Sequence, residues 1–166
     1  EVTPLYTNYA AGWTLTNWDF ARLGVSGDVD FTNKMVKDSS PFESGKVMNE
    51  IYQLLFDVSE KKLIEADPTT SDWEQSKSDM ANNKVAVMVL GSWAVPQIQE
   101  IVPENASNIV FQAFPMEDSS GKQYMGVGGD YNLAINVNSE HKEAARKLLD
   151  WLINESNYST DNGGLP

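Results

Sequence analysis

Residues 82–98, NNKVAVMVLGSWAVPQI, carry the strongest fold signal in this sequence. The apolar run at residues 85–90 has the length and composition of a strand that is buried on both faces. The strand stops at Gly91-Ser92, and Trp93 stands at the start of the next helix. A tryptophan in that place either completes a core or offers a stacking face to something outside the protein. Because a strand-to-helix junction lies at the edge of a sheet, we favour the second role for Trp93.

Helix signals occur on both sides of this strand. Residues 40–43 (SPFE) combine a capping box with proline at the first helical position, and an apolar stripe at helical spacing follows over residues 47–58. Residues 71–74 (SDWE) form a second capping box, which should open a short helix that ends near residues 82–83. We also expect a helix over about residues 13–23. A last helix should begin after Ser139 and bury an apolar face made by Ala144, Ala145, Leu148, Leu149, Leu152 and Ile153.

Two further segments have strand patterns. Residues 108–114 (NIVFQAF) are largely apolar, and residues 131–137 (YNLAINV) alternate apolar and small or polar side chains with the period of a half-buried strand. Strands separated by helical patterns favour a helix-covered mixed sheet over a sandwich. The expected fold class is therefore α/β, rich in helix, with a small mixed sheet.

The composition indicates a soluble globular chain and excludes some partners. A chain of 166 residues with 41% hydrophobic content can bury one core, so residues 1–166 are expected to form a single domain. The formal net charge of −12 argues against nucleic acid and against an anionic membrane surface. The sequence opens without a methionine and ends in a turn-like DNGGLP, so we expect it to be an excerpt of a longer protein.

Candidate catalytic and metal sites are weak. Ser92 follows a strand and a glycine, but a nucleophile elbow needs glycines where this sequence has Leu90 and Ala94. The single histidine, His141, lies in a polar helix start and is expected to be solvated. Without cysteine, little remains for zinc, so no metal or cofactor is expected. A carboxylate pair of the glycosidase type stays open as an alternative among 24 acidic residues, although no pair stands out.

Aromatic residues are the more informative group. An aromatic face packs well against the C–H face of a sugar ring, while neighbouring amide and carboxylate groups bond the hydroxyls. Trp18 and Trp151 fall on helical apolar faces and are expected to be core, and Trp73 is expected to pack at a helix start. The glycine cluster at residues 126–129 lacks the dinucleotide spacing, and it indicates either a close backbone approach to a ligand or a plain loop.

The ordered combination of these features resembles a known family. The stretch NNKVAVMVLGSWAVPQI resembles the helix, turn, strand and Gly-Ser/Pro-Trp junction of bacterial extracellular solute-binding proteins of family 1, the maltose-binding-protein-like group of sugar ABC importers. TPLYTNYAAGWTLTNW, residues 3–18, resembles the segment where the chain passes into the second lobe. GVGGDYNLAINVNSEHKEAARKLLDWLI, residues 126–153, resembles the glycine-rich junction, strand and helix of the family. The resemblance covers essentially the whole chain.

The resemblance implies a periplasmic-binding-protein-like (type II) fold, of which this chain is most of the C-terminal lobe. The N-terminal lobe, a signal and any lipid anchor would lie outside it, and the protein would be extracellular or periplasmic at the cell surface. It would bind a solute, expected to be a neutral sugar or oligosaccharide, between lobes that close by a hinge, and pass it to ABC permease subunits. It would not be an enzyme and would need no cofactor.

The resemblance also implies site residues. Trp93 becomes a stacking face, the glycine-rich junction places Gly128 and Gly129 at the cleft, and Asp130 becomes an acceptor for a sugar hydroxyl. Further contacts are expected from Tyr6, Tyr9 and Trp13, although the resemblance leaves open which of the three faces the ligand. Tyr131, which follows Asp130, is expected to contact the ligand as well. A rival hypothesis is an interaction domain in which Trp93 and Tyr131 are core. The scarcity of basic residues near the expected cleft disfavours an anionic ligand.

Overall fold

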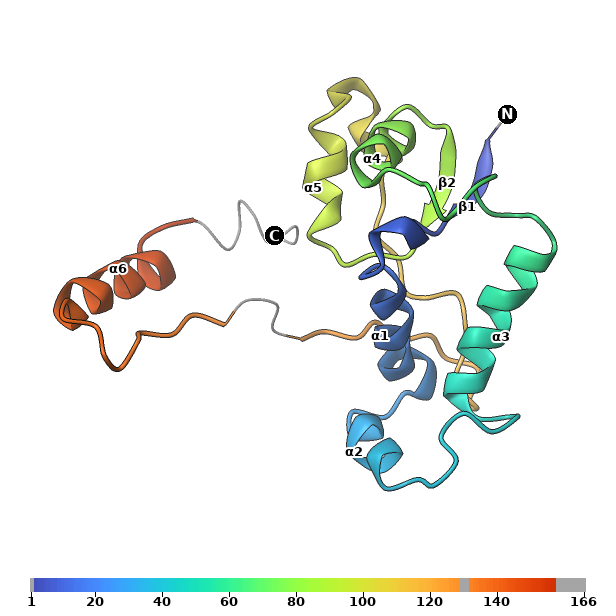
Figure 1. The fold of residues 1–166 in the computed structure, drawn as a ribbon, viewed down its shortest axis with the longest axis horizontal. Helices are drawn as coiled ribbons and strands as arrows, with labels where there is room; N and C mark the ends of the chain where they lie inside the picture. Colours follow the sequence, from blue (N-terminus) through green and yellow to red (C-terminus); the bar gives the residue numbers. More distant parts are fainter. Residues whose placement is uncertain (1, 129–131, 158–166) are drawn as a thin grey trace. The chain divides into compact units, whose positions relative to one another are not determined.

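Two parallel strands lie side by side in the computed structural model, which describes residues 2–128 and 132–157 (Figure 1). Strand β1 (Thr3–Tyr6) pairs with β2 (Val85–Met88), and Leu5 stands opposite Val87. The chain divides into two units, residues 1–126 and 127–166. The expectation of a single domain stays a prediction.

Short helices fill the connection between the strands, as a parallel pair requires. Among the described residues, no helix has both the length and the apolar composition that a bilayer crossing demands. The connection contains η1 (Tyr9–Ala11), α1 (Leu15–Ser26), α2 (Phe31–Val36), α3 (Val47–Glu60) and α4 (Trp73–Ala81), and β2 is followed by α5 (Ala94–Gln99), η2 (Pro103–Asn108) and α6 (Lys142–Asn154).

The main core lies where α1 packs on α3 beside the sheet. The apolar stripe predicted for residues 47–58 is confirmed, since Ile51 and Leu55 of α3 are buried against Trp18 of α1. Burying side chains of this size stabilises the fold by about 1.5–3 kcal/mol each. The prediction that Trp18 belongs to the core is therefore confirmed, because only 3% of its surface is exposed.

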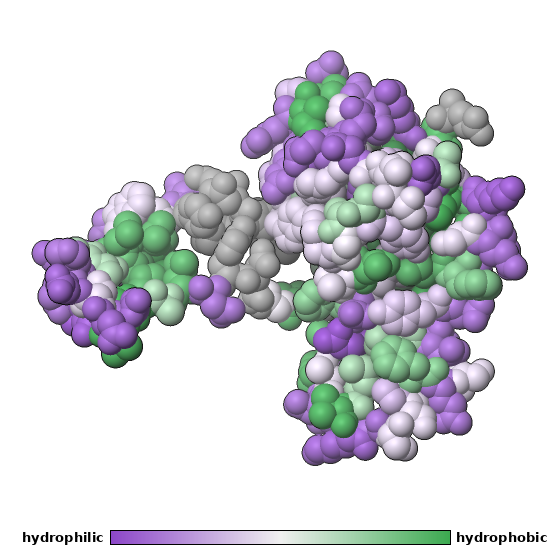
Figure 2. Space-filling model, viewed as in Figure 1, coloured by the Kyte–Doolittle hydropathy of each residue, from purple (hydrophilic) through white to green (hydrophobic). Residues whose placement is uncertain are grey.

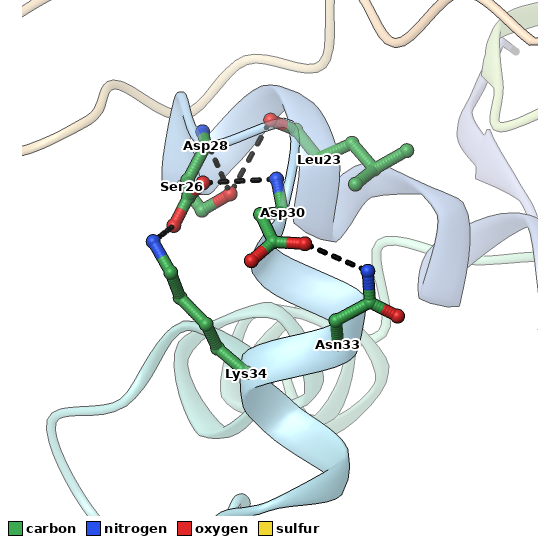
Figure 3. Close-up of polar contacts among 6 residues, drawn as sticks. All are labelled: Leu23, Ser26, Asp28, Asp30, Asn33 and Lys34. Atoms are coloured by element: carbon green, nitrogen blue, oxygen red, sulfur yellow. Dashed lines mark hydrogen bonds and ion pairs between the residues drawn. The ribbon is translucent and has the colours of Figure 1, made fainter.

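A polar turn joins α1 to α2 (Figure 3). Gly27 ends α1 with φ of 63°, a left-handed conformation that glycine adopts freely. The Asp28 carboxylate accepts a hydrogen bond from the Asp30 backbone N–H at 2.9 Å and pairs with Lys34 Nζ at 2.6 Å. The hydrogen bond from Lys34 is the main reason that the pKa of Asp28 lies below its usual value. These contacts fix the direction in which the chain leaves α1.

The predicted capping boxes do not cap α3 and α4 as expected. Residues 40–43 form only a turn, and α3 begins at Val47, because Gly45 has φ of 81° and interrupts the helix. Helix α4 is capped by Asp72 and not by Ser71, since the Asp72 carboxylate accepts from the Gln75 backbone N–H at 2.7 Å. The end of α4 near residues 82–83 is as predicted.

The predicted strands are only partly confirmed. Residues 85–88 form β2, but burial on both faces is wrong, because Val87 is 49% exposed and β2 has one partner among the described residues. Residues 108–114 form no strand, since η2 continues to Asn108 and irregular chain follows. Residues 132–137 are also irregular. A strand needs a neighbour for its backbone hydrogen bonds, and these segments have none in the described chain. The observed sheet is consequently parallel and not mixed.

The second unit contains α6, which confirms the helix predicted after Ser139. The prediction that α6 buries an apolar face is wrong in the structure, because Leu148 is 57% exposed and Ile153 68% exposed. Trp151, predicted to be core, is 50% exposed. Green apolar side chains lie among purple charged ones on this helix (Figure 2). An amphipathic helix needs an opposing layer to cover its apolar face, and the described residues of this unit supply none.

Candidate ligand-binding site

The carboxyl ends of the two strands define one edge of the sheet. Ligands of open α/β sheets bind beyond this edge, where the segments that follow parallel strands come together. Residues 7–13 follow β1, and residues 89–93 follow β2. Helix α4 turns back through residues 82–84 into β2, so Trp73, the first residue of α4, lies near Trp93, which precedes α5.

Three indoles meet at this edge, and we call Trp13, Trp73 and Trp93 the indole cluster. The ring centroids of Trp13 and Trp73 are 5.0 Å apart with an interplanar angle of 76°, an edge-to-face contact. Trp93 lies 5.7 Å from Trp13 and 6.0 Å from Trp73 in tilted orientations. Pairs at these distances stabilise one another by about 0.5–1.5 kcal/mol beyond the effect of burial. The cluster is therefore a set of mutually supporting aromatic rings.

Gly91 allows Trp93 to take its position. A Cβ atom at residue 91 would lie 2.4 Å from the indole Nε1 of Trp93, so only glycine leaves room for the ring. Trp93 is partly buried and packs against a second core cluster, which consists of Ala81, Ala94, Ile98 and Ile109. Trp13 is 42% exposed. The cluster thus rests on a core at one side and reaches solvent at the other.

The charges around the cluster are mostly negative or neutralised. Lys77 Nζ lies 5.2 Å from the centre of the Trp73 ring, a cation–π contact, and pairs with Glu74 at 2.9 Å. The Lys77 ammonium also donates to Gln97 Oε1 at 3.4 Å. Asp72 and Glu74 flank Trp73 in the chain. The Lys77 ammonium beside the rings is therefore already paired with a carboxylate.

The structure brings together two of the predicted site residues, Trp13 and Trp93, and adds Trp73. Tyr6 ends β1 and is partly buried, and burial, followed by the nearby charge of Glu65, raises its pKa. Tyr9 lies in η1 and packs against the main core. Gly128 is exposed in the second unit. The remaining predicted residues, Gly129, Asp130 and Tyr131, lie outside the described residues.

The role predicted for Trp73 was too narrow. Trp73 does pack at a helix start, as predicted, but its packing partners are the other two indoles. The short reversal at residues 82–84 is a signal that could have identified it, since a helix and a strand joined by a tight turn place their far ends together.

His141 is exposed at the start of α6, in agreement with the solvated role predicted for it. Within residues 2–128 and 132–157, no group of three or more metal-ligating side chains is close enough to hold an ion.

Comparison with known proteins places these features in a family context. Residues 3–158 match the family model described as "Bacterial extracellular solute-binding protein". A curated relative, the "Multiple sugar-binding protein" of Streptococcus mutans serotype c (strain ATCC 700610 / UA159), is 25% identical over 154 residues, which is 90% of this chain and 36% of that protein.

Solved structures of solute-binding proteins are also similar to this chain. One is a manno-oligosaccharide specific solute binding protein from Bifidobacterium animalis subsp. lactis ATCC 27673 in complex with mannotriose; it is 35% identical, with a TM-score of 0.88, over 99% of this chain and 40% of that one. Another is a binding protein of an ABC transporter from the same organism, also with mannotriose, at 33% identity and a TM-score of 0.91, over 99% of this chain and 41% of that one. The chain therefore spans about two fifths of the length of these solved relatives.

Proposed function

The chain belongs to the bacterial extracellular solute-binding protein family, and from this premise we propose that it binds a neutral oligosaccharide for an ABC-type importer. Its fold is the helix-rich α/β fold of type II periplasmic-binding-protein-like sugar binders. Two solved relatives hold mannotriose, so a manno-oligosaccharide is the first ligand class to test.

The observation that carries the proposal is the indole cluster at the carboxyl edge of the parallel strands. The C–H face of a sugar ring stacks on an indole, and the exposed side of Trp13 is open to such a ring. Trp93 extends the aromatic surface beside it. We assign Trp13 and Trp93 to stacking, and Trp73 to the support of both.

The chain supplies only one side of the proposed site. Because residues 3–18 resemble the segment where the chain passes into the second lobe, we assign the chain to the C-terminal lobe of a two-lobed protein. The N-terminal lobe would cover the ligand by hinge closure. In this assignment Asp130 accepts a hydrogen bond from a sugar hydroxyl. The remaining proposed contacts are made by Tyr6, Tyr9, Gly128, Gly129 and Tyr131. The isolated chain is expected to bind sugar weakly or undetectably, since half of the site is missing.

The cellular role follows from the same proposal. The protein acts outside the membrane, in the periplasm or at the cell surface, and hands its ligand to permease subunits. Substrate leaves the site unchanged, because the proposed mechanism consists of reversible stacking, hydrogen bonding and lobe closure. A glycoside-active enzyme is the contrasting possibility, and turnover of a reporter glycoside would distinguish it.

Isothermal titration of the full-length protein with mannotriose tests the proposal. We expect binding by the wild type, and a loss of affinity of about 30-fold or more in Trp93→Ala, which corresponds to about 2 kcal/mol for a central aromatic contact. Trp18→Phe, at a buried core position, is the matched aromatic control and should keep the affinity.

The unfolding temperature separates the stacking role from a core role. In the stacking role Trp93→Ala loses affinity with a modest decrease in stability, whereas a core tryptophan would cost about 3–5 kcal/mol of folding free energy. Wild-type affinity in Trp93→Ala, or hydrolysis of the sugar by the wild type, would contradict the proposed function.

A further inference from the structure

A buried polar network lies behind the indole cluster. The described part of the chain buries six polar or charged residues, and each of them belongs to, or directly contacts, a segment that carries an indole of the cluster. The six are Thr7, Asn8, Thr14, Glu65, Ser76 and Lys77. Burial of polar side chains is costly unless they are hydrogen-bonded, so their concentration in this one place needs an explanation.

Glu65 is the centre of the network. Glu65 is 7% exposed, and its carboxylate accepts three hydrogen bonds from the segment that follows β1. Oε2 accepts from the Thr7 backbone N–H at 2.8 Å. Oε1 accepts from the Thr7 hydroxyl at 2.7 Å and from the Asn8 backbone N–H at 2.8 Å. Hydrogen bonds to an ionised acceptor are about twice as strong as neutral ones, so the three bonds to Glu65 fix the backbone at Thr7 and Asn8.

Asn8 connects Glu65 by hydrogen bonds to the two segments that carry Trp13 and Trp73. Its backbone has φ of 56°, and its carbonyl oxygen accepts from the Thr14 hydroxyl at 2.9 Å, one residue after Trp13. The Asn8 side chain donates to Ser76 Oγ at 2.9 Å, and the Ser76 hydroxyl donates to the carbonyl oxygen of Trp73 at 2.8 Å. A continuous chain of hydrogen bonds therefore runs from Glu65 to the backbones that carry Trp13 and Trp73.

We propose that Glu65 is a positioning residue of the sugar site, which sets the geometry of the indole cluster through Thr7 and Asn8 without touching the ligand. This inference rests on the proposed function for its effect on affinity. A set of rings held in the binding arrangement loses little freedom when the ligand arrives, so preorganisation appears directly as affinity. An apolar residue at position 65 would pack in the same space but would leave two backbone N–H groups and the Thr7 hydroxyl without their acceptor.

The test uses the full-length protein with Glu65→Gln and Thr7→Val. The first keeps the shape of the side chain but replaces one acceptor oxygen by a donor, and the second removes only the hydroxyl donor and is the milder change. Ile51→Val, in the core between α1 and α3, is the control for a general loss of stability. Each variant is measured by titration with mannotriose, by thermal unfolding, and by circular dichroism for the exciton signal of coupled indoles. Trp13→Phe identifies the part of that signal that comes from the cluster.

We expect Glu65→Gln to weaken mannotriose binding at least tenfold and to reduce the exciton signal, with a smaller change of both in Thr7→Val. Ile51→Val should lower the unfolding temperature and leave both readouts unchanged. If both network variants unfold at lower temperature but keep the exciton signal and the affinity within twofold, Glu65 is merely structural and the inference is overturned. If Glu65→Gln does not fold, Thr7→Val decides by the same criteria.

Failure of the proposed function gives a different result. In that case the wild type does not bind mannotriose, and the exciton signal alone decides the inference. A reduced signal in the network variants then supports the positioning role of Glu65, and an unchanged signal overturns it.

Discussion

Gly91→Ala is the smallest change that should damage the indole cluster. The added Cβ would lie 2.4 Å from Nε1 and 2.6 Å from Cδ1 of Trp93. Carbon atoms pack at about 3.5–4.0 Å, so the indole must retreat by about 1 Å or leave its position. Gly91 has no positive φ, which means that alanine itself fits the backbone and the damage is confined to the ring.

The size of the effect follows from the two aromatic contacts of Trp93. The contacts with Trp13 and Trp73, at 5.7 and 6.0 Å, contribute about 0.5–1.5 kcal/mol each, so complete displacement costs about 1–3 kcal/mol. We expect the unfolding free energy to fall within this range. If Trp93 stacks on the ligand, affinity should fall at least about tenfold, which corresponds to about 1.4 kcal/mol.

Urea unfolding and titration with mannotriose, both on the full-length protein, measure the two effects. Gly126→Ala is the matched control, because its Cβ would meet Leu23 Cβ at 3.5 Å, an ordinary contact distance. Gly126→Ala should keep both stability and affinity. The stacking role would be refuted if tryptophan fluorescence shows that Trp93 is displaced in Gly91→Ala and the variant still binds mannotriose with wild-type affinity.

Three further predictions concern the scaffold of the site. Asp72→Ala removes the cap that accepts from the Gln75 N–H at 2.7 Å, and should cost about 1 kcal/mol in urea unfolding. Asn8→Gly keeps the left-handed backbone at φ of 56° and should be more stable than Asn8→Ala, which adds backbone strain to the loss of the same side-chain bond; equal unfolding temperatures would contradict this. Burial, together with the hydrogen bond that the Tyr52 hydroxyl donates to Asp19, raises the pKa of Tyr52 to about 12. Since Tyr52 binds its proton more tightly in the folded state, its contribution is complete below about pH 10 and is lost as the pH rises towards 12; the alkaline fall of the unfolding temperature should therefore be shallower in Tyr52→Phe.

Local patterns predicted the longer helices, whereas the six-residue helix α2 was not predicted. The stripe that includes Ile51 and Leu55 depends only on spacing within one element, and α3 buries it as expected. The predicted start of α3 was wrong, because Gly45, with its φ of 81°, prevents the helix from beginning before it. The capping box at residues 40–43 gives no sign of this interruption.

Strands were harder to predict because their stability comes from distant partners. Residues 108–114 and 132–137 have strand-like composition but find no neighbouring ladder in the described chain. Strand β1 was missed for the opposite reason, since its four residues contain Pro4 and show little alternation, yet they pair with β2. The sheet is therefore the part of the fold that one segment alone determines least.

The candidate site shows the same division. Trp93 could be selected from its place at the end of a strand, and Trp13 from the family resemblance, but their contact with Trp73 joins positions far apart in the sequence. Glu65 has no sequence signal of its own, because its role depends on the turn at Thr7 and Asn8 reaching it across the fold.

Fluorine NMR of the full-length protein labelled with 5-fluorotryptophan would test the central claim, that the open side of the indole cluster receives the sugar. Resonances are assigned with single Trp→Phe variants, and mannotriose is added to saturation. We predict that the resonances of Trp13 and Trp93 shift, while that of Trp18, which is 3% exposed in the core, stays in place. Saturation with bound mannotriose that moves none of the cluster resonances would contradict the account.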